Sequence, residues 1–134
     1  MWKILIAEDN PADAHRLMQG LSQVAHCVLA KDGIETLSIY RESVESGSAF
    51  DFILLDVKLP KKDGFDVLKT IRNGEESVDL PRSREAKVIM TTTYRDSLME
   101  NYNMGWDDFI TKPVDADILT KRLRELEIES KKSD

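Results

Sequence analysis

The segment that most constrains the fold is a short apolar run that stops on a single acid, FILLD at residues 52–56. Its four consecutive apolar residues include β-branched and aromatic side chains, which is typical of a strand buried on both faces of a parallel sheet. Asp56 then falls at the carboxyl end of this strand, and Pro60 and Gly64 mark a turn before a helical pattern begins. Ligands of open α/β sheets bind outside the carboxyl ends of the strands, so Asp56 is a candidate functional residue.

The same arrangement opens the chain. The apolar run KILIA at residues 3–7 is followed at once by two adjacent carboxylates, Glu8 and Asp9. Asn10 has the character of a helix N-cap and Pro11 that of a first-turn residue, and apolar residues then recur at helical spacing over 14–24. We therefore expect a strand that ends on two acids and leads directly into a helix.

Further strands and helices follow in alternation along the chain. Strands are predicted at 27–30, at 88–90 running into a threonine run, and at 109–110; helices are predicted at 34–44, 64–71, from Asp96 or Ser97 to near Gly105, and at 115–128. Residues 73–87 form the longest expected loop, and Asp107 and Asp108 are expected in a solvated turn. Five strands alternating with five helices predict a doubly wound parallel sheet, for which the flavodoxin-like order 2-1-3-4-5 is one common solution.

Composition limits the classes of protein that this chain can belong to. Its 134 residues are 41% apolar and 33% charged, which fits one soluble domain with its own core. No apolar run approaches the length of a membrane span, the first residues lack the pattern of a signal peptide, and the single cysteine, Cys27, permits no internal disulfide. We therefore expect a cytoplasmic protein without a membrane partner, and the net charge of −6 argues against nucleic-acid binding.

Polar residues gather where the predicted strands end. The first strand ends on Glu8 and Asp9, the third on Asp56, the fourth on threonines and the fifth on Lys112. In a parallel sheet these ends share one edge, so three carboxylates, a hydroxyl and an ammonium converge. Close carboxylates repel one another unless a cation joins them, and Mg²⁺ accepts such ligands while it also binds phosphate oxygens. With Lys112 and a threonine hydroxyl beside it, the carboxylate of Asp56 has the surroundings of a nucleophile for phosphoryl transfer.

The motifs ILIAEDN, FILLDVKLPKKDG, VIMTTT and GWDDFITKPV agree jointly in type, order and spacing with one family. The chain resembles the CheY-like response regulator receiver domains of two-component signalling over essentially its whole length. The resemblance implies a receiver domain over residues 1–129, followed by a charged, frayed tail at 130–134. It also implies that the chain is no enzyme beyond taking up a phosphoryl group from a donor and releasing it again.

The resemblance implies a role for each site residue. Asp56 is the phosphoacceptor, and the Mg²⁺ ion is held by Asp9, Asp56, the backbone carbonyl of Lys58 and, through water, Glu8. Thr92 and Lys112 bind the phosphoryl group, with Thr91 left as an alternate for Thr92. Thr92 and Phe109 form the switch, Lys58 and Tyr94 tune the lifetime of the phosphate, and the bond between Lys112 and Pro113 is expected to be cis.

The implied partners are proteins. A histidine kinase or a phosphotransfer protein supplies the phosphoryl group, and the face formed by the fourth helix, fifth strand and last helix binds a downstream protein target or passes the phosphoryl group on in a phosphorelay. Dimerisation on phosphorylation is left open. The native start at Met1 and the fading tail favour a complete single-domain chain, and the alternative is a receiver cut from a longer regulator or hybrid kinase. A Mg²⁺-dependent aspartyl-phosphate phosphatase is disfavoured because Lys58 stands where such enzymes carry a second acid.

Overall fold

A five-stranded parallel sheet forms the centre of the molecule. The computed structural model describes residues 1–77, 85–93 and 104–132. The strand order is β2-β1-β3-β4-β5, as the alternation of strands and helices predicted. In this order the strands are β2 (Ala25–Ala30), β1 (Trp2–Ala7), β3 (Phe52–Asp56), β4 (Lys87–Thr92) and β5 (Asp108–Thr111).

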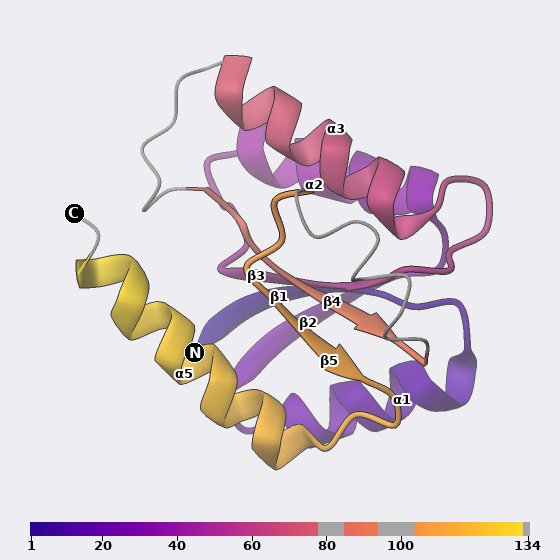
Figure 1. Cartoon of the computed structure of the whole chain (residues 1–134), viewed down its shortest axis with the longest axis vertical. Coiled ribbons are helices and arrows are strands. Elements are labelled where there is room, and N and C mark those ends of the chain that lie inside the picture. The colour runs from indigo at the N-terminus through magenta and orange to yellow at the C-terminus, as the bar shows by residue number, and fades with distance from the viewer. Residues whose placement is uncertain (78–84, 94–103, 133–134) are drawn as a thin grey trace.

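Helices cover both faces of the sheet. Figure 1 shows α2 (Gly33–Glu45) and α3 (Gly64–Ser77) on one face, and α1 (Pro11–Leu21) and α5 (Ala116–Lys132) on the other. Because side chains of a strand point alternately to the two faces, Ile53 and Leu55 enter the core beneath α2 and α3, and Phe52 and Leu54 enter the core beneath α1 and α5. All five residues of β3 are buried, which explains why this strand is a continuous apolar run rather than an alternating pattern.

The first two helices begin as the sequence indicates. The side chain of Asn10 accepts a hydrogen bond of 3.0 Å from the backbone N–H of Asp13, and Pro11 opens α1. Asp32 caps α2 in the same way by accepting a bond of 2.8 Å from the N–H of Glu35. These caps fix where each helix leaves its preceding strand, and they hold the start of α1 beside the acidic end of β1.

Two expected boundaries differ from the observed ones. Residues 73–77 continue α3 instead of opening a loop. The reason is tertiary: Glu75 is only 3% exposed and accepts a bond of 2.6 Å from the backbone N–H of Ala86, so the helix is held past Gly74 by residues far along the chain. The last helix continues through Lys132, beyond its expected end at 128.

Two side chains, Ile118 and Asp107, also lie in surroundings that differ from those expected. The helical spacing of apolar residues predicts both Ile118 and Leu119 on the inner face of the last helix, but Ile118 is 53% exposed and Leu119 is buried. Asp107 is not a solvated turn residue, because its carboxylate pairs with Arg72 at 2.9 Å. The helix expected between Asp96 or Ser97 and Gly105 falls largely on residues 94–103, outside the described part. Among the described helices, none is both long enough and apolar enough to cross a membrane.

Candidate functional site

The sheet register brings the polar strand ends to one edge. Ala7 of β1 pairs with Leu55 of β3, so Glu8 and Asp56 follow at neighbouring positions. Asp56 pairs with Thr91, and Thr92 pairs with Thr111, the residue before Lys112. The structure therefore places these polar side chains at the predicted edge of the sheet.

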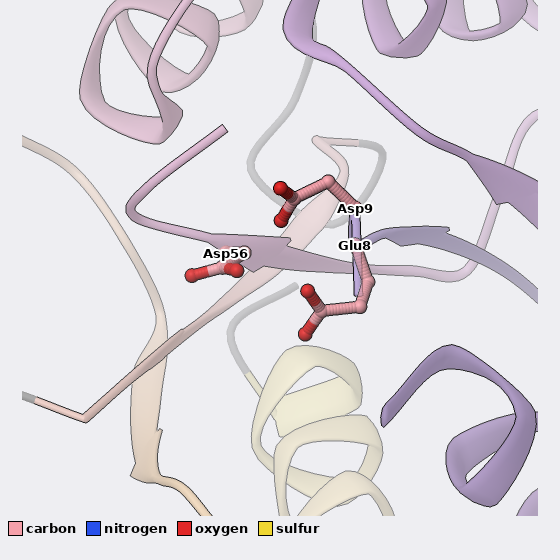
Figure 2. A group of neighbouring side chains, drawn as sticks. All are labelled: Glu8, Asp9 and Asp56. Atoms are coloured by element: carbon pink, nitrogen blue, oxygen red, sulfur yellow. The ribbon is translucent and has the colours of Figure 1, made fainter. Parts of the chain in front are cut away.

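Three carboxylates lie together at this edge. One oxygen from each of Glu8, Asp9 and Asp56 lies within 4.8 Å of the others, and Figure 2 shows their carboxyl groups on the same side of the strand ends. Glu8 and Asp56 are buried, with 2% and 6% of their surface exposed, whereas Asp9 is exposed. The cluster thus has two buried carboxylates and one that faces solvent.

Lys112 supplies the positive charge of the site. Its Nζ lies 2.8 Å from Asp56 Oδ2 and 2.5 Å from Glu8 Oε1. The second oxygen of Glu8 accepts a bond of 3.1 Å from the N–H of Asn10. Glu8 therefore has partners on both carboxylate oxygens, although three acids surround one ammonium.

The pKa shifts reflect this crowding. Burial raises the pKa of Glu8 above its usual value, and the nearby Asp56 charge raises it further, against the opposing bonds from Lys112 and Asn10. For Lys112, burial acts to lower the pKa, but hydrogen bonds and charges from Asp56 and Glu8 outweigh it and leave the pKa raised. The ammonium is thus held charged, and the excess negative charge makes the cluster attractive to a further cation.

The backbone after Asp56 closes tightly over the acid. The N–H of Lys58 donates to Asp56 Oδ1 at 3.2 Å, and the N–H of Gly64 donates to Val57 O at 2.8 Å. A Cβ at Gly64 would meet the Asp56 carbonyl oxygen at 2.2 Å. Only glycine lets α3 begin this close to the strand end, which explains the Gly64 of the sequence motif.

The remaining predicted residues lie around this centre. Thr91 and Thr92 are both buried at the end of β4, and Phe109 is half-buried against the core beneath α2 and α3. The peptide bond between Lys112 and Pro113 is cis, as the resemblance led us to expect. Tyr94 lies outside the described residues.

Sequence patterns did not identify Asp13 as a neighbour of Lys112. Asp13 Oδ2 lies 3.8 Å from Lys112 Nζ, so a carboxylate of α1 joins the surroundings of the ammonium. The available signal was its position three residues after the Asn10 cap, in the helical turn nearest the acidic end of β1. That signal alone does not give the distance, which depends on how α1 packs against the connection from β5 to α5.

The donor set fits a hard divalent cation such as Mg²⁺. Oxygen ligands from carboxylates, with one exposed side leaving room for waters or phosphate oxygens, are what that ion prefers. Glu8, Asp9 and Asp56 are the residues that would hold it. The arrangement therefore combines the buried carboxylate of Asp56, a fixed ammonium and a place for a metal ion.

Curated relatives match over most of this chain. It is 32% identical over 131 residues to the DNA-binding dual master transcriptional regulator RpaA of Synechocystis, covering 94% of this chain and 49% of that protein. It is 31% identical over 116 residues to hybrid signal transduction histidine kinase L of Dictyostelium discoideum, covering 84% of this chain and 6% of that protein. The chain thus spans about half the length of the regulator and a small fraction of the length of the hybrid kinase.

Solved structures give the same result for the fold. A CheY-like response regulator receiver domain protein from Methanospirillum hungatei JF-1 superposes with a TM-score of 0.79 at 26% identity, covering 100% of this chain and 99% of that one. The family model of the response regulator receiver domain matches residues 4–124. This range covers β1 from Ile4, all of the other four strands and the whole acidic edge. The chain therefore belongs to the response regulator receiver domain family.

Proposed function

We propose that this receiver accepts a phosphoryl group on Asp56 in a Mg²⁺-dependent reaction, from a histidine kinase or a phosphotransfer protein. The observation that carries the proposal is the contact of the buried Asp56 carboxylate with Lys112 at 2.8 Å, inside a cluster that includes Glu8 and Asp9. Carboxylates this close together repel one another unless a cation joins them. Asp56 has a cation on one side and two further acids beside it.

The chemistry follows from these positions. A carboxylate oxygen of Asp56 forms a bond to the donor phosphorus, the bond from phosphorus to the leaving group breaks, and the leaving group carries away the electron pair. Lys112 and the Thr92 hydroxyl bind phosphoryl oxygens and offset their charge. Mg²⁺ held by Asp9, Asp56, the Lys58 carbonyl and, through water, Glu8 would supply further charge neutralisation.

The proposed output is a change in protein contacts. Phosphorylation draws the Thr92 hydroxyl toward the phosphoryl group, and the half-buried Phe109 turns inward into the freed space. This favours one of two states of the face that includes β5 and α5. A downstream protein reads that face, or the phosphoryl group passes on in a phosphorelay, and Lys58 and Tyr94 set how long the phosphate persists.

Intact mass spectrometry tests the proposal directly. The wild type and Asp56→Asn are incubated with acetyl phosphate, with Mg²⁺ or with EDTA. The wild type should gain one phosphoryl group only with Mg²⁺, and the variant should gain none. Uptake that survives in Asp56→Asn would place the acceptor elsewhere, and repeated hydrolysis of acetyl phosphate would favour a phosphatase.

The relatives support a second form of the same proposal. One is a hybrid histidine kinase and another a DNA-binding regulator, and this chain matches only part of each. In the second form, the receiver controls a domain or kinase attached to it in a longer protein rather than a separate target. The reading frame that encodes the chain distinguishes the two, and either form places the reaction in the cytoplasm.

A further inference from the structure

Lys112 has three acidic neighbours from three different elements. Glu8 follows β1, Asp56 ends β3, and Asp13 lies on α1 with its Oδ2 3.8 Å from Lys112 Nζ. The first two belong to the acidic cluster that would hold the metal ion. Asp13 lies outside that cluster and places its charge near the ammonium.

Asp13 lies near the surface beside Lys112 rather than in the core. It lines a small pocket between α1 and the connection from β5 to α5, together with Glu8, Arg16, Leu17, Lys112, Pro113 and Val114. Its side chain is 35% exposed, whereas that of Lys112 is 14% exposed. Its other neighbour is Arg16 at 4.0 Å, and because that side chain is 61% exposed the pair offsets little of the charge.

We propose that Asp13 is a specificity-determining residue that slows phosphorylation of Asp56 by small, doubly charged phosphodonors. Its carboxylate places negative charge beside the ammonium that must receive the phosphoryl oxygens. A donor with two negative charges is repelled more strongly than a donor with one. This inference rests on the proposed phosphorylation of Asp56 and identifies which donors that reaction favours.

The same charge affects a protein donor less. A phosphorylated histidine on a partner protein gains contacts outside the pocket, and these offset a local repulsion at its phosphoryl group. Acetyl phosphate has no such contacts, so the repulsion appears directly in its rate. Asp13 thereby favours protein partners over metabolites that carry a reactive phosphoryl group.

The test measures the rate of Asp56 phosphorylation in Asp13→Asn with two donors. Acetyl phosphate carries two negative charges at neutral pH and phosphoramidate carries one. In either reaction the phosphoryl group moves to an Asp56 oxygen, and acetate or ammonia leaves. We expect a rate increase of about three- to tenfold with acetyl phosphate and a smaller one with phosphoramidate, since the repulsion scales with donor charge. Raising the salt concentration should shrink both increases.

Asp66→Asn is the matched control. Asp66 occupies in the first turn of α3 the position that Asp13 occupies in α1, three residues after a capping side chain that accepts its N–H. The two variants should lose similar stability on thermal denaturation, because each removes a favourable charge from a helix start. Only Asp13→Asn should react faster.

Several results would overturn the inference. Equal rates for Asp13→Asn and a wild type that is phosphorylated normally would refute the role of Asp13 and leave the proposed function standing. An equal increase with both donors, or the same increase in Asp66→Asn, would refute the electrostatic explanation. Failure of both proteins to gain a phosphoryl group would overturn the inference together with the proposed function.

Discussion

The guanidinium of Arg72 on α3 lies 2.9 Å from the carboxylate of Asp107, the residue before β5. It also donates to Glu75 at 2.7 Å and to the carbonyl oxygens of Ala86 at 2.7 Å and Gly105 at 2.8 Å. Asp107 in turn accepts a bond of 2.8 Å from the N–H of Val88. One side chain therefore ties α3 to the starts of β4 and β5, at the end of the sheet opposite Asp56.

Replacing Arg72 should destabilise the fold strongly. In Arg72→Ala the buried Glu75 loses its cation, and two carbonyl oxygens lose their donor. We expect the free energy of unfolding to fall by about 2 to 4 kcal/mol, because an unpaired buried charge is costly. Urea denaturation followed by Trp fluorescence measures this loss.

Two variants control that experiment. Arg16→Ala removes a mostly exposed arginine whose nearest acid is 4.0 Å away, and it should cost less than about 0.5 kcal/mol. Arg72→Lys keeps the charge but cannot reproduce the planar set of donors, so it should recover only part of the stability. Similar losses for Arg72→Ala and Arg16→Ala would show that the contacts of Arg72 contribute nothing beyond a surface pair.

Ionisation of Tyr40, whose hydroxyl contacts Glu75, should lower the stability of the fold at high pH. Burial, reinforced by the charge of Glu75 3.4 Å from its hydroxyl, raises the pKa of Tyr40 to about 12. The unfolded chain loses this proton near pH 10. Since the pKa is raised on folding, the contribution is complete below about pH 10 and is lost as the pH rises through about 12.

Absorbance at 295 nm measures that titration. One of the three tyrosines should ionise at a pH well above the pKa of a free phenol. This late step should be missing in Tyr40→Phe. The variant should also lose less stability than the wild type between pH 10 and 12. If the late step persists in Tyr40→Phe, it belongs to another tyrosine.

The site could be predicted from the sequence because it depends on local patterns and one rule of topology. Apolar runs locate β1 and β3, and parallel strands place their carboxyl ends together, which brings Glu8 and Asp56 to neighbouring positions. Asn10 and Gly64 then mark where the flanking helices begin. None of these inferences needed a distance between side chains.

The features that sequence patterns missed depend on contacts between distant segments. Glu75 lies in a polar stretch, and its contacts with Ala86, Arg72 and Tyr40 make it a buried residue of α3. Ile118 and Leu119 are adjacent and equally apolar, so the way α5 lies on the sheet decides which is buried. Asp13 approaches Lys112 only through the packing of α1.

Repulsion among the acids at this edge lowers the stability of the fold when no metal ion is bound. One carboxylate oxygen from each of Glu8, Asp9 and Asp56 lies within 4.8 Å of the others, and of these three acids the described ion pairs join only Glu8 and Asp56 to Lys112. Asp9 adds a like charge to this group without a cation of its own among the described ion pairs. Groups that serve a site in this way often lower the stability of the protein that carries them.

Asp9→Asn should therefore be more stable than the wild type in EDTA, by about 0.5 kcal/mol, because it removes one repelling charge. With Mg²⁺ the order should reverse, since an ion that binds only the folded state stabilises it in proportion to its affinity, and the variant lacks a ligand. Urea denaturation at several Mg²⁺ concentrations measures both effects. Asp66→Asn is again the control: it should gain nothing in EDTA and should respond to Mg²⁺ as the wild type does. A wild type that Mg²⁺ leaves unchanged, or an Asp9→Asn variant stabilised by Mg²⁺ to the same degree, would contradict the assignment of these carboxylates to a metal site.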